Sequence, residues 1–128
     1  MDAESAAMTW AATWERAWPE RDAAAIARLY ADEVSYRSHP LRDPYPGGAL
    51  AYTQWAFADE DEVSCWFGVP IVSGQRAAVE WWATLLEDGR PVTLIGTTVL
   101  RFGPDGKVRE HRDYWLMDEG HRSPYAGW

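Results

Sequence analysis

The sequence predicts an α+β fold in which three N-terminal helices pack on a strongly curved, mixed or antiparallel sheet. Helical patterns fill the first half of the chain, whereas the second half holds only β-prone runs divided by turns. The 128 residues include nine tryptophans and six tyrosines. A sheet folded against three helices leaves a barrel-like, cone-shaped interior, and this aromatic content is suited to line a pocket there.

The first two helices are predicted from apolar spacing and from their ends. Trp10, Trp14 and Trp18 lie on one helical face, and the helix should stop near Pro19. Asp22 can cap a second, alanine-rich helix that runs through Tyr30.

A short strand, a loop and a third helix follow. Val34 to His39 alternates as a strand that ends at Pro40, and residues 40–48 are rich in proline and glycine. The third helix is predicted at about Ala49 to Ala58. The acidic run from Asp59 to Glu62 is interpreted as a solvated corner.

Only strands are predicted after this corner. Their approximate ranges are Val63–Val72, Arg76–Leu86, Pro91–Phe102 and Lys107–Met117. The Gly103–Gly106 cluster between the last two is a hairpin signal.

Composition limits the classes of partner. The formal charge is 12 − 20 = −8, which disfavours nucleic acid and anionic membranes, because both require basic patches. Cys65 is the only cysteine, so a reducing, cytoplasmic location is expected. No apolar run approaches membrane-spanning length. We expect a single domain over residues 1–128.

The last strand carries the strongest chemical signal. His111, Asp113, Trp115 and Met117 share one of its faces because strand side chains alternate. A carboxylate beside an imidazole and an indole has a perturbable proton, and a His–Asp pair can relay one. The alternative is that Asp113 and His111 are structural.

The chain resembles the nuclear transport factor 2-like superfamily, especially its SnoaL-like branch. The segments that carry the resemblance are Trp18–Ile26, Tyr30–Val34, Tyr36–Pro40, Gly96–Phe102 and Gly106–Val108 leading to His111–Trp115. The resemblance implies a deep apolar pocket between sheet and helices, and a homodimer formed through the outer sheet face. It does not fix the activity, because this fold hosts isomerases, cyclases, dehydratases, hydrolases and binding proteins.

Strand parity combined with the resemblance predicts the residues of the pocket. Trp14 and Trp18 should cap it from the first helix. The predicted inward-facing residues of the strands are Tyr36, Ser38, Val79, Trp81, Ala83, Val92, Leu94, Gly96, Thr98, His111, Asp113 and Trp115.

The stretch Arg112-Asp113-Tyr114 looks like the limonene epoxide hydrolase segment that carries an acid/base aspartate. Tyr36 and Ser38 stand where that enzyme has a tyrosine and an asparagine that position water. Its arginine and second aspartate correspond to about Val79 and Trp81 here. A shift of the strand by one residue would instead turn Glu80 inward.

His39 before Pro40 is similar to ketosteroid isomerase, which has an aspartate base before a proline. The oxyanion acid of that enzyme falls at about Thr98, and its helix tyrosine near the Trp14–Trp18 stripe. A hydroxyl and an indole N–H are weaker oxyanion donors than a neutral carboxylic acid. A facial metal site of His39, His111 and Asp113 is a further alternative, although we expect no metal and no cofactor.

Trp82 follows Trp81 on a strand, so its ring should lie on the outer sheet surface and favour the dimer interface. The C-terminal tail, Gly120–Trp128, either covers the pocket mouth, reaches a second subunit or is frayed.

Two hypotheses for function follow. The first is a cofactor-free acid/base enzyme acting on a small apolar or polycyclic molecule. Its catalytic residues would be Asp113, His111, Tyr36 and His39, and its substrate-binding residues Trp14, Trp18, Ser38, Trp81, Leu94, Thr98 and Trp115. The second is a binding module for a small apolar or aromatic ligand, in which the same residues perform no chemistry.

Overall fold

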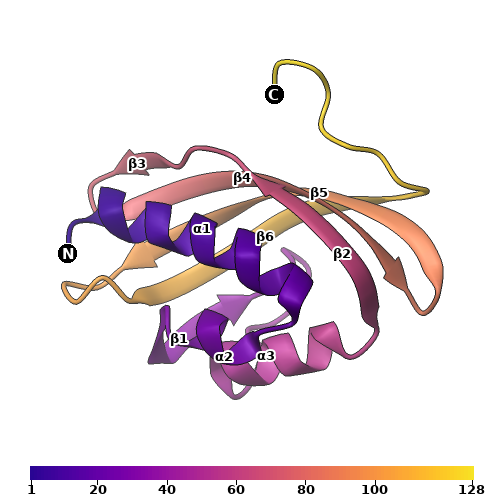
Figure 1. The fold of residues 1–128 in the computed structure, drawn as a ribbon. Helices are drawn as coiled ribbons and strands as arrows, with labels where there is room; N and C mark the ends of the chain where they lie inside the picture. The colour runs from indigo at the N-terminus through magenta and orange to yellow at the C-terminus, as the bar shows by residue number, and fades with distance from the viewer.

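The computed structural model describes all 128 residues. Figure 1 shows the first helix crossing in front of a long, curved sheet, with the other two helices below it. In chain order the elements are α1 (Ala3–Glu20), α2 (Ala23–Ala27), β1 (Tyr30–Arg37), α3 (Gly48–Phe57), β2 (Glu60–Phe67), β3 (Ile71–Ser73), β4 (Arg76–Glu87), β5 (Arg90–Phe102) and β6 (Val108–Glu119).

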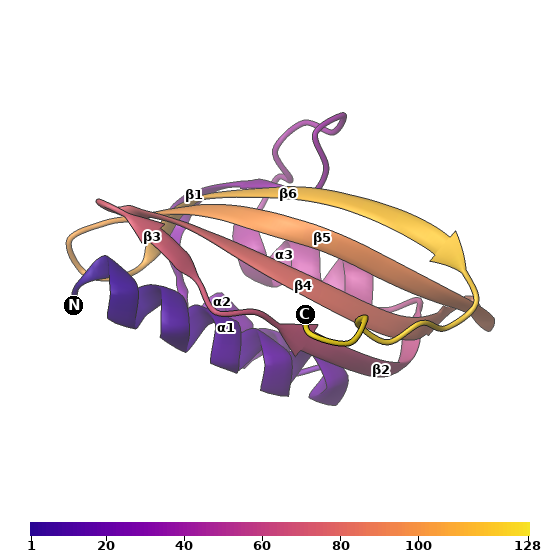
Figure 2. The ribbon, with the colours of Figure 1, turned by 90° about the horizontal axis from the view of Figure 1, so that it is seen from above.

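The six strands form one mixed sheet with the order β1-β6-β5-β4-β2, and β3 pairs with part of β4. Every pairing is antiparallel except that of β1 with β6. The predicted α+β cone is confirmed, but the sheet is not closed into a barrel, because β1 and β2 remain its two edges. Figure 2 shows α1 running along one side of the sheet, so a single face is covered by helix.

Helix α1 has a clear start and a buried face. The Asp2 side chain accepts a hydrogen bond from the Ser5 N–H, which caps the helix at Ala3, well before the predicted tryptophan stripe. Pro19 lies in the last turn, and the helix ends when Arg21 takes a left-handed conformation. Five of its alanines are buried together with Trp10, Trp14 and Trp18.

Two predicted boundaries are wrong in a way that matters for the site. Helix α2 has only five residues, and Tyr30 begins β1 rather than ending a helix. The predicted strand Val34–His39 therefore starts earlier and stops at Arg37. The reason is tertiary: Tyr30 pairs with Val108 on β6, and the pairing overrides local helix propensity.

The predicted acidic corner and the strand after it differ in part from the structure: Asp59, Asp61 and Glu62 are exposed, but Glu60 is not. The strand predicted at Val63–Val72 is two strands, β2 and β3, separated by residues 68–70, where Pro70 cannot donate a ladder hydrogen bond. Strand β2 begins at Glu60, inside the run expected to be a solvated corner. Glu60 pairs with Glu87 of β4 and lines the interior cavity described below.

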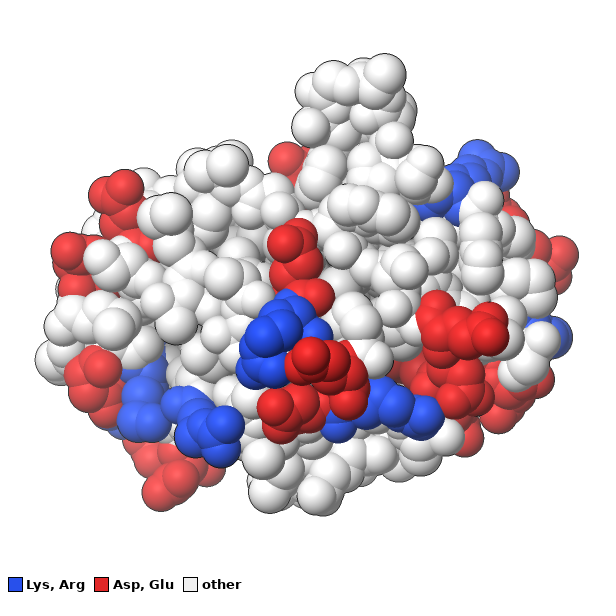
Figure 3. Space-filling model, in the orientation of Figure 1, with Lys and Arg blue, Asp and Glu red and all other residues white.

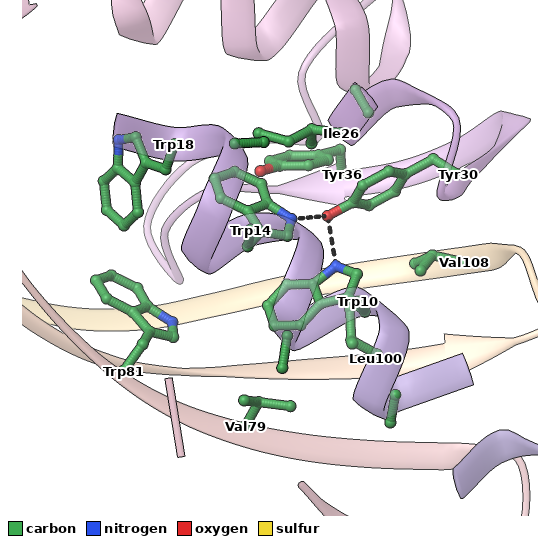
Figure 4. Close-up of a cluster of buried hydrophobic side chains, with 14 of the residues drawn as sticks. Trp10, Trp14, Trp18, Ile26, Tyr30, Tyr36, Val79, Trp81, Leu100 and Val108 are labelled. Carbon is green, nitrogen blue, oxygen red and sulfur yellow. Dashed lines mark hydrogen bonds between the residues drawn. The ribbon is translucent and has the colours of Figure 1, made fainter. Parts of the chain in front are cut away.

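The core is an aromatic layer between α1 and the sheet (Figure 4). Trp81 meets Trp18 edge to face, with ring centroids 5.7 Å apart. The Trp81 ring has room because the opposite residue on β5 is Gly96. A Cβ at Gly96 would lie 2.8 Å from atoms of both Trp81 and Trp115.

The C-terminal tail packs on the outer face of the sheet and contributes no residue to the cavity. Tyr125 meets Trp82 with ring centroids 6.1 Å apart, and Trp128 lies within 3.5 Å of the position of a Cβ on Gly68. The sequence predicts that the Trp82 ring lies bare on the outer sheet surface. In the structure, Tyr125 of the same chain partly covers this ring. Thr93 is also buried there, because it donates to the Gly120 carbonyl.

On the face drawn in Figure 3, lysines and arginines alternate with acidic residues and form no continuous basic patch. None of the helices has both the length and the apolar character that crossing a membrane requires.

Candidate functional site

A cavity of about 210 Å³, open to the surface, lies between the sheet, α1 and α3. Its walls come from both layers of the fold and are mostly apolar and aromatic. The lining residues are Trp10, Trp14, Trp18, Tyr36, Arg42, Tyr52, Trp55, Ala56, Phe57, Asp59, Glu60, Phe67, Trp81, Glu87, Leu94, Thr98, His111, Asp113 and Trp115.

Most of the residues proposed from the sequence meet in this cavity. Three of the four candidate catalytic residues line it, namely Asp113, His111 and Tyr36. Six of the seven candidate substrate-binding residues also line it: Trp14, Trp18, Trp81, Leu94, Thr98 and Trp115. The alternation of side chains along β4, β5 and β6 brings them together from distant parts of the sequence.

Ser38 and His39 are the two exceptions. Ser38 is buried, but its carbonyl accepts from the Trp115 indole N–H and its hydroxyl accepts from Arg42, and it does not line the cavity. His39 accepts from the Leu41 N–H and packs edge-on against Trp115 outside the cavity. Both lie beyond the end of β1 at Arg37, where strand alternation no longer applies.

Asp113 is held by a relay of hydrogen bonds that crosses the sheet. The Trp81 indole N–H donates to the Thr98 hydroxyl over 2.9 Å, and that hydroxyl donates to Asp113 Oδ1 over 2.6 Å. Thr98 can deliver this bond because it lies directly opposite Asp113 on the neighbouring strand. The relay leaves Asp113 Oδ2 without a hydrogen bond inside the protein, and therefore available to a molecule in the cavity.

A chain of hydrogen bonds connects α1 to His111 through Tyr30. Figure 4 shows its first two bonds, from Trp10 and Trp14 to the Tyr30 hydroxyl. The indole N–H groups of Trp10 and Trp14 both donate to the Tyr30 oxygen, at 2.9 and 3.1 Å. Indole is only a donor, so these two bonds occupy both acceptor positions of the phenol. The Tyr30 O–H must then donate to His111 Nδ1, 2.9 Å away. His111 is therefore the neutral tautomer with its proton on Nε2.

The contact between His111 and Asp113 is close but poorly aligned. His111 Nε2 lies 2.8 Å from Asp113 Oδ1, yet its N–H does not point along this line, so Nε2 has no aligned hydrogen-bond partner. Proton exchange between the two side chains would need a small rotation of the carboxylate. As it stands, the site holds a carboxylate beside a buried, under-satisfied N–H donor.

Tyr36 forms the floor beneath the imidazole. Its ring stacks on that of His111 with centroids 3.8 Å apart, because the two residues are paired across β1 and β6. Burial raises the pKa of Tyr36 well above its ordinary value, and the nearby Tyr30 and Asp113 raise it further. Tyr36 therefore stays a neutral phenol at physiological pH.

The alternative register of β4 is wrong. Val79 and Trp81 are buried and face inward, whereas Glu80 is exposed on the outer face. The carboxylate that a shifted strand would have restored is absent from the cavity, and the two positions matched to the hydrolase arginine and aspartate are apolar.

Among the cavity residues that the sequence analysis missed, Glu60 is the one with the most perturbed carboxyl group. Its Oε1 accepts from the Trp18 indole N–H over 2.8 Å. Burial, the largest effect, raises the pKa of Glu60 to about 7; Glu87 and Asp59 add to the rise, while the Trp18 bond and Arg21 oppose it. Strand alternation gives no signal for this residue, because the pairing of β2 with β4 is irregular between Asp61 and Ser64.

The facial metal site considered from spacing does not form, because His39 lies outside the cavity that holds His111 and Asp113. No group of three histidine, cysteine or acidic side chains is arranged to hold a metal ion.

These features define a cone-shaped domain with an aromatic pocket and an internal carboxylate. The chain belongs to the SnoaL-like domain family, which matches residues 11–111. A search of curated proteins finds no match.

Solved structures share the fold at low sequence identity. One of them is SalBIII, described as an epoxide hydrolase/cyclase-like enzyme in pyran ring formation in the polyether salinomycin. Its TM-score is 0.77 at 18% identity, and the match covers 92% of this chain and 98% of that one. RV0760c from Mycobacterium tuberculosis has a TM-score of 0.74 at 18% identity, with coverages of 91% and 97%. A hypothetical protein from Catenulispora acidiphila with a ketosteroid isomerase-like fold, solved with trimethylamine, has a TM-score of 0.69 at 18% identity, with coverages of 80% and 82%.

Proposed function

We propose that this protein is a cofactor-free acid/base enzyme that acts on a small, ring-containing, largely apolar molecule. The observation that carries the proposal is the unshared Oδ2 of Asp113, a cavity-facing carboxylate oxygen beside a neutral His111 whose Nε2–H lacks an aligned acceptor. A base and a hydrogen-bond donor side by side are the two groups that proton transfer at a polarised carbon or oxygen requires.

The roles follow from the hydrogen bonds. Asp113 removes or delivers the proton through Oδ2, because the Thr98 hydroxyl already occupies Oδ1. His111 orients Asp113 and can relay its proton, since Tyr30 occupies Nδ1 and the buried Nε2 lies 2.8 Å from Asp113 Oδ1. Tyr36 supports the imidazole by stacking and offers a neutral phenol. His39 has no direct role in this scheme because it lies outside the cavity.

The cavity limits the substrate. A volume of about 210 Å³ lies below the roughly 300 Å³ of typical drug-sized sites, which favours one or two rings over a larger polycycle. Indole and phenyl rings from α1, α3 and β4 offer flat apolar walls. The reaction class is isomerisation, cyclisation, dehydration or hydration.

The test is to incubate the protein in D₂O with one- and two-ring ketones and epoxides, and to follow deuterium exchange and product formation by NMR. Asp113→Asn should lower any turnover by about 10²-fold or more. Asp32→Asn is the matched control, because Asp32 is exposed on β1. Full turnover by Asp113→Asn would remove Asp113 from the chemistry.

The second candidate is a binding module. It is favoured by the fact that Asp113 Oδ1 already takes part in a structural relay from Trp81 and Thr98. In that case Asp113→Asn would change the affinity of a bound ketone, and no panel member would turn over in the wild-type protein.

We also propose a homodimer through the outer sheet face. Leu116, 77% exposed, and Tyr114, 46% exposed, lie there on β6 beside the Trp82–Tyr125 contact. Light scattering of the wild-type protein should give the mass of two chains, and Leu116→Lys should give one.

The single free cysteine, Cys65, supports the reducing cytoplasm as the location of the protein.

A further inference from the structure

We infer that Glu60 forms a second ligand-binding pole of the cavity, in addition to Asp113, and that the ligands of this pocket carry a cationic nitrogen which contacts Glu60. The inference rests on the proposed small-molecule pocket and names the class of ligand that it takes. The cavity wall at this pole is formed by Trp18 of α1, Phe57 of α3 and Glu60 of β2.

The Glu60 carboxylate is incompletely satisfied. Its one hydrogen bond is from the Trp18 indole N–H to Oε1, and Oε2 has no partner within the protein. No arginine, lysine or histidine nitrogen lies within ion-pair distance of it. A largely buried carboxylate with a single donor is costly to ionise, so a cationic ligand beside it would recover free energy.

The surrounding charges reinforce this polarity. Asp59 and Glu87 line the same cavity, and neither takes part in an ion pair. Arg21, the cation whose charge acts on Glu60, is engaged by Asp61 and by the Phe57 carbonyl. Arg42, the one arginine on the cavity wall, lies over the Trp115 ring. Burial, the largest effect, raises the pKa of Glu60 to about 7, and the negative charges of Glu87 and Asp59 add to the rise.

Aromatic rings supply the rest of a cation site. Trp14 packs edge to face against both Trp18 and Phe57, with centroids 5.7 and 6.4 Å apart, and all three line the cavity. Indole and phenyl faces attract cations and remain apolar toward the body of the ligand. The same wall repels carboxylates and phosphates, so the pocket should discriminate by charge.

The test compares benzyltrimethylammonium with its uncharged isostere neopentylbenzene, using tryptophan fluorescence and NMR titrations of the full chain. We expect the cation to bind at least tenfold more tightly. Since the cation favours ionised Glu60, its affinity should rise about tenfold between pH 6 and pH 8, as a group with a pKa of about 7 ionises. The neutral probe should show no such rise.

Glu60→Gln should reduce the preference for the cation to within about twofold and abolish its pH dependence. The amide oxygen can still accept from Trp18, so the variant retains that contact. Glu62→Gln is the matched control and should behave as wild type, because the Glu62 side chain is exposed and does not line the cavity. In addition, ¹³C NMR of the wild-type Glu60 carboxyl should show its pKa falling when the cation binds.

Equal binding of the two probes, or an unchanged preference in Glu60→Gln, would overturn the inference and leave the pocket function standing. Failure of both probes to bind would count against the pocket and the inference together.

Discussion

The Tyr30 hydroxyl donates to Nδ1 of His111 because two indole N–H groups already occupy its oxygen. This single relationship fixes the imidazole as a neutral Nε2–H donor. It also joins α1 to the sheet, since the donors come from the helix and the acceptor from β6.

Tyr30→Phe should remove this junction. Two buried indole N–H groups lose their acceptor and His111 loses its donor, so the free energy of unfolding should fall by about 2–4 kcal/mol. Urea denaturation measures this loss, with the exposed Tyr125→Phe as a control. ¹⁵N NMR of wild-type His111 should show a protonated Nε2 and a bare Nδ1 at neutral pH. An Nδ1–H tautomer would contradict the assigned donor role.

Thr98→Val should break the relay to Asp113 while preserving side-chain shape. The Trp81 N–H and the Asp113 Oδ1 atom each lose a buried partner, so a loss of about 1–3 kcal/mol in unfolding free energy is expected. The neighbouring Thr97→Val, whose side chain is on the opposite face of β5, should have little effect. If thermal unfolding of the two variants coincides, the relay does not stabilise the fold.

Gly96→Ala should distort the cavity wall. The new methyl group would lie 2.8 Å from Trp81, from Trp115 and from the Tyr114 carbonyl, which costs about 1–3 kcal/mol through overpacking. Gly68→Ala is the control, because its nearest neighbour would lie at 3.4 Å. Near-UV circular dichroism should report altered tryptophan packing in Gly96→Ala alone; identical spectra for both variants would argue against the close approach.

Glu60 should make stability depend on pH. Its folded pKa of about 7 lies above the ordinary value of 4.5, so the folded state binds more protons between these values and stability should fall as pH rises from about 4.5 to 7. Glu60→Gln should remove this component and be the more stable protein at pH 8. The upper limit is on the order of 3 kcal/mol, since one pKa unit corresponds to about 1.4 kcal/mol. Urea titrations from pH 4 to pH 8 measure it; parallel curves for variant and wild type would refute the assignment.

Much of the cavity could be predicted from local pattern. Alternation on β6 turned His111 and Asp113 to one face, and the helical spacing of Trp14 and Trp18 placed them over it. These periodicities depend only on backbone geometry, so they survive without knowledge of the fold. The prediction failed for Ser38 and His39, because β1 ends before them.

Local propensity and side-chain period were enough to predict the class of fold, the helices followed by strands, and the side of the last strand that faces inward. The division of the predicted strand Val63–Val72 into β2 and β3, the tautomer of His111, the entry of Glu60 into the cavity and the position of the tail became evident only from the folded chain. Each of these depends on contacts between residues far apart in the chain, such as Tyr30 with His111 and Trp18 with Glu60, and no local pattern encodes such a distance.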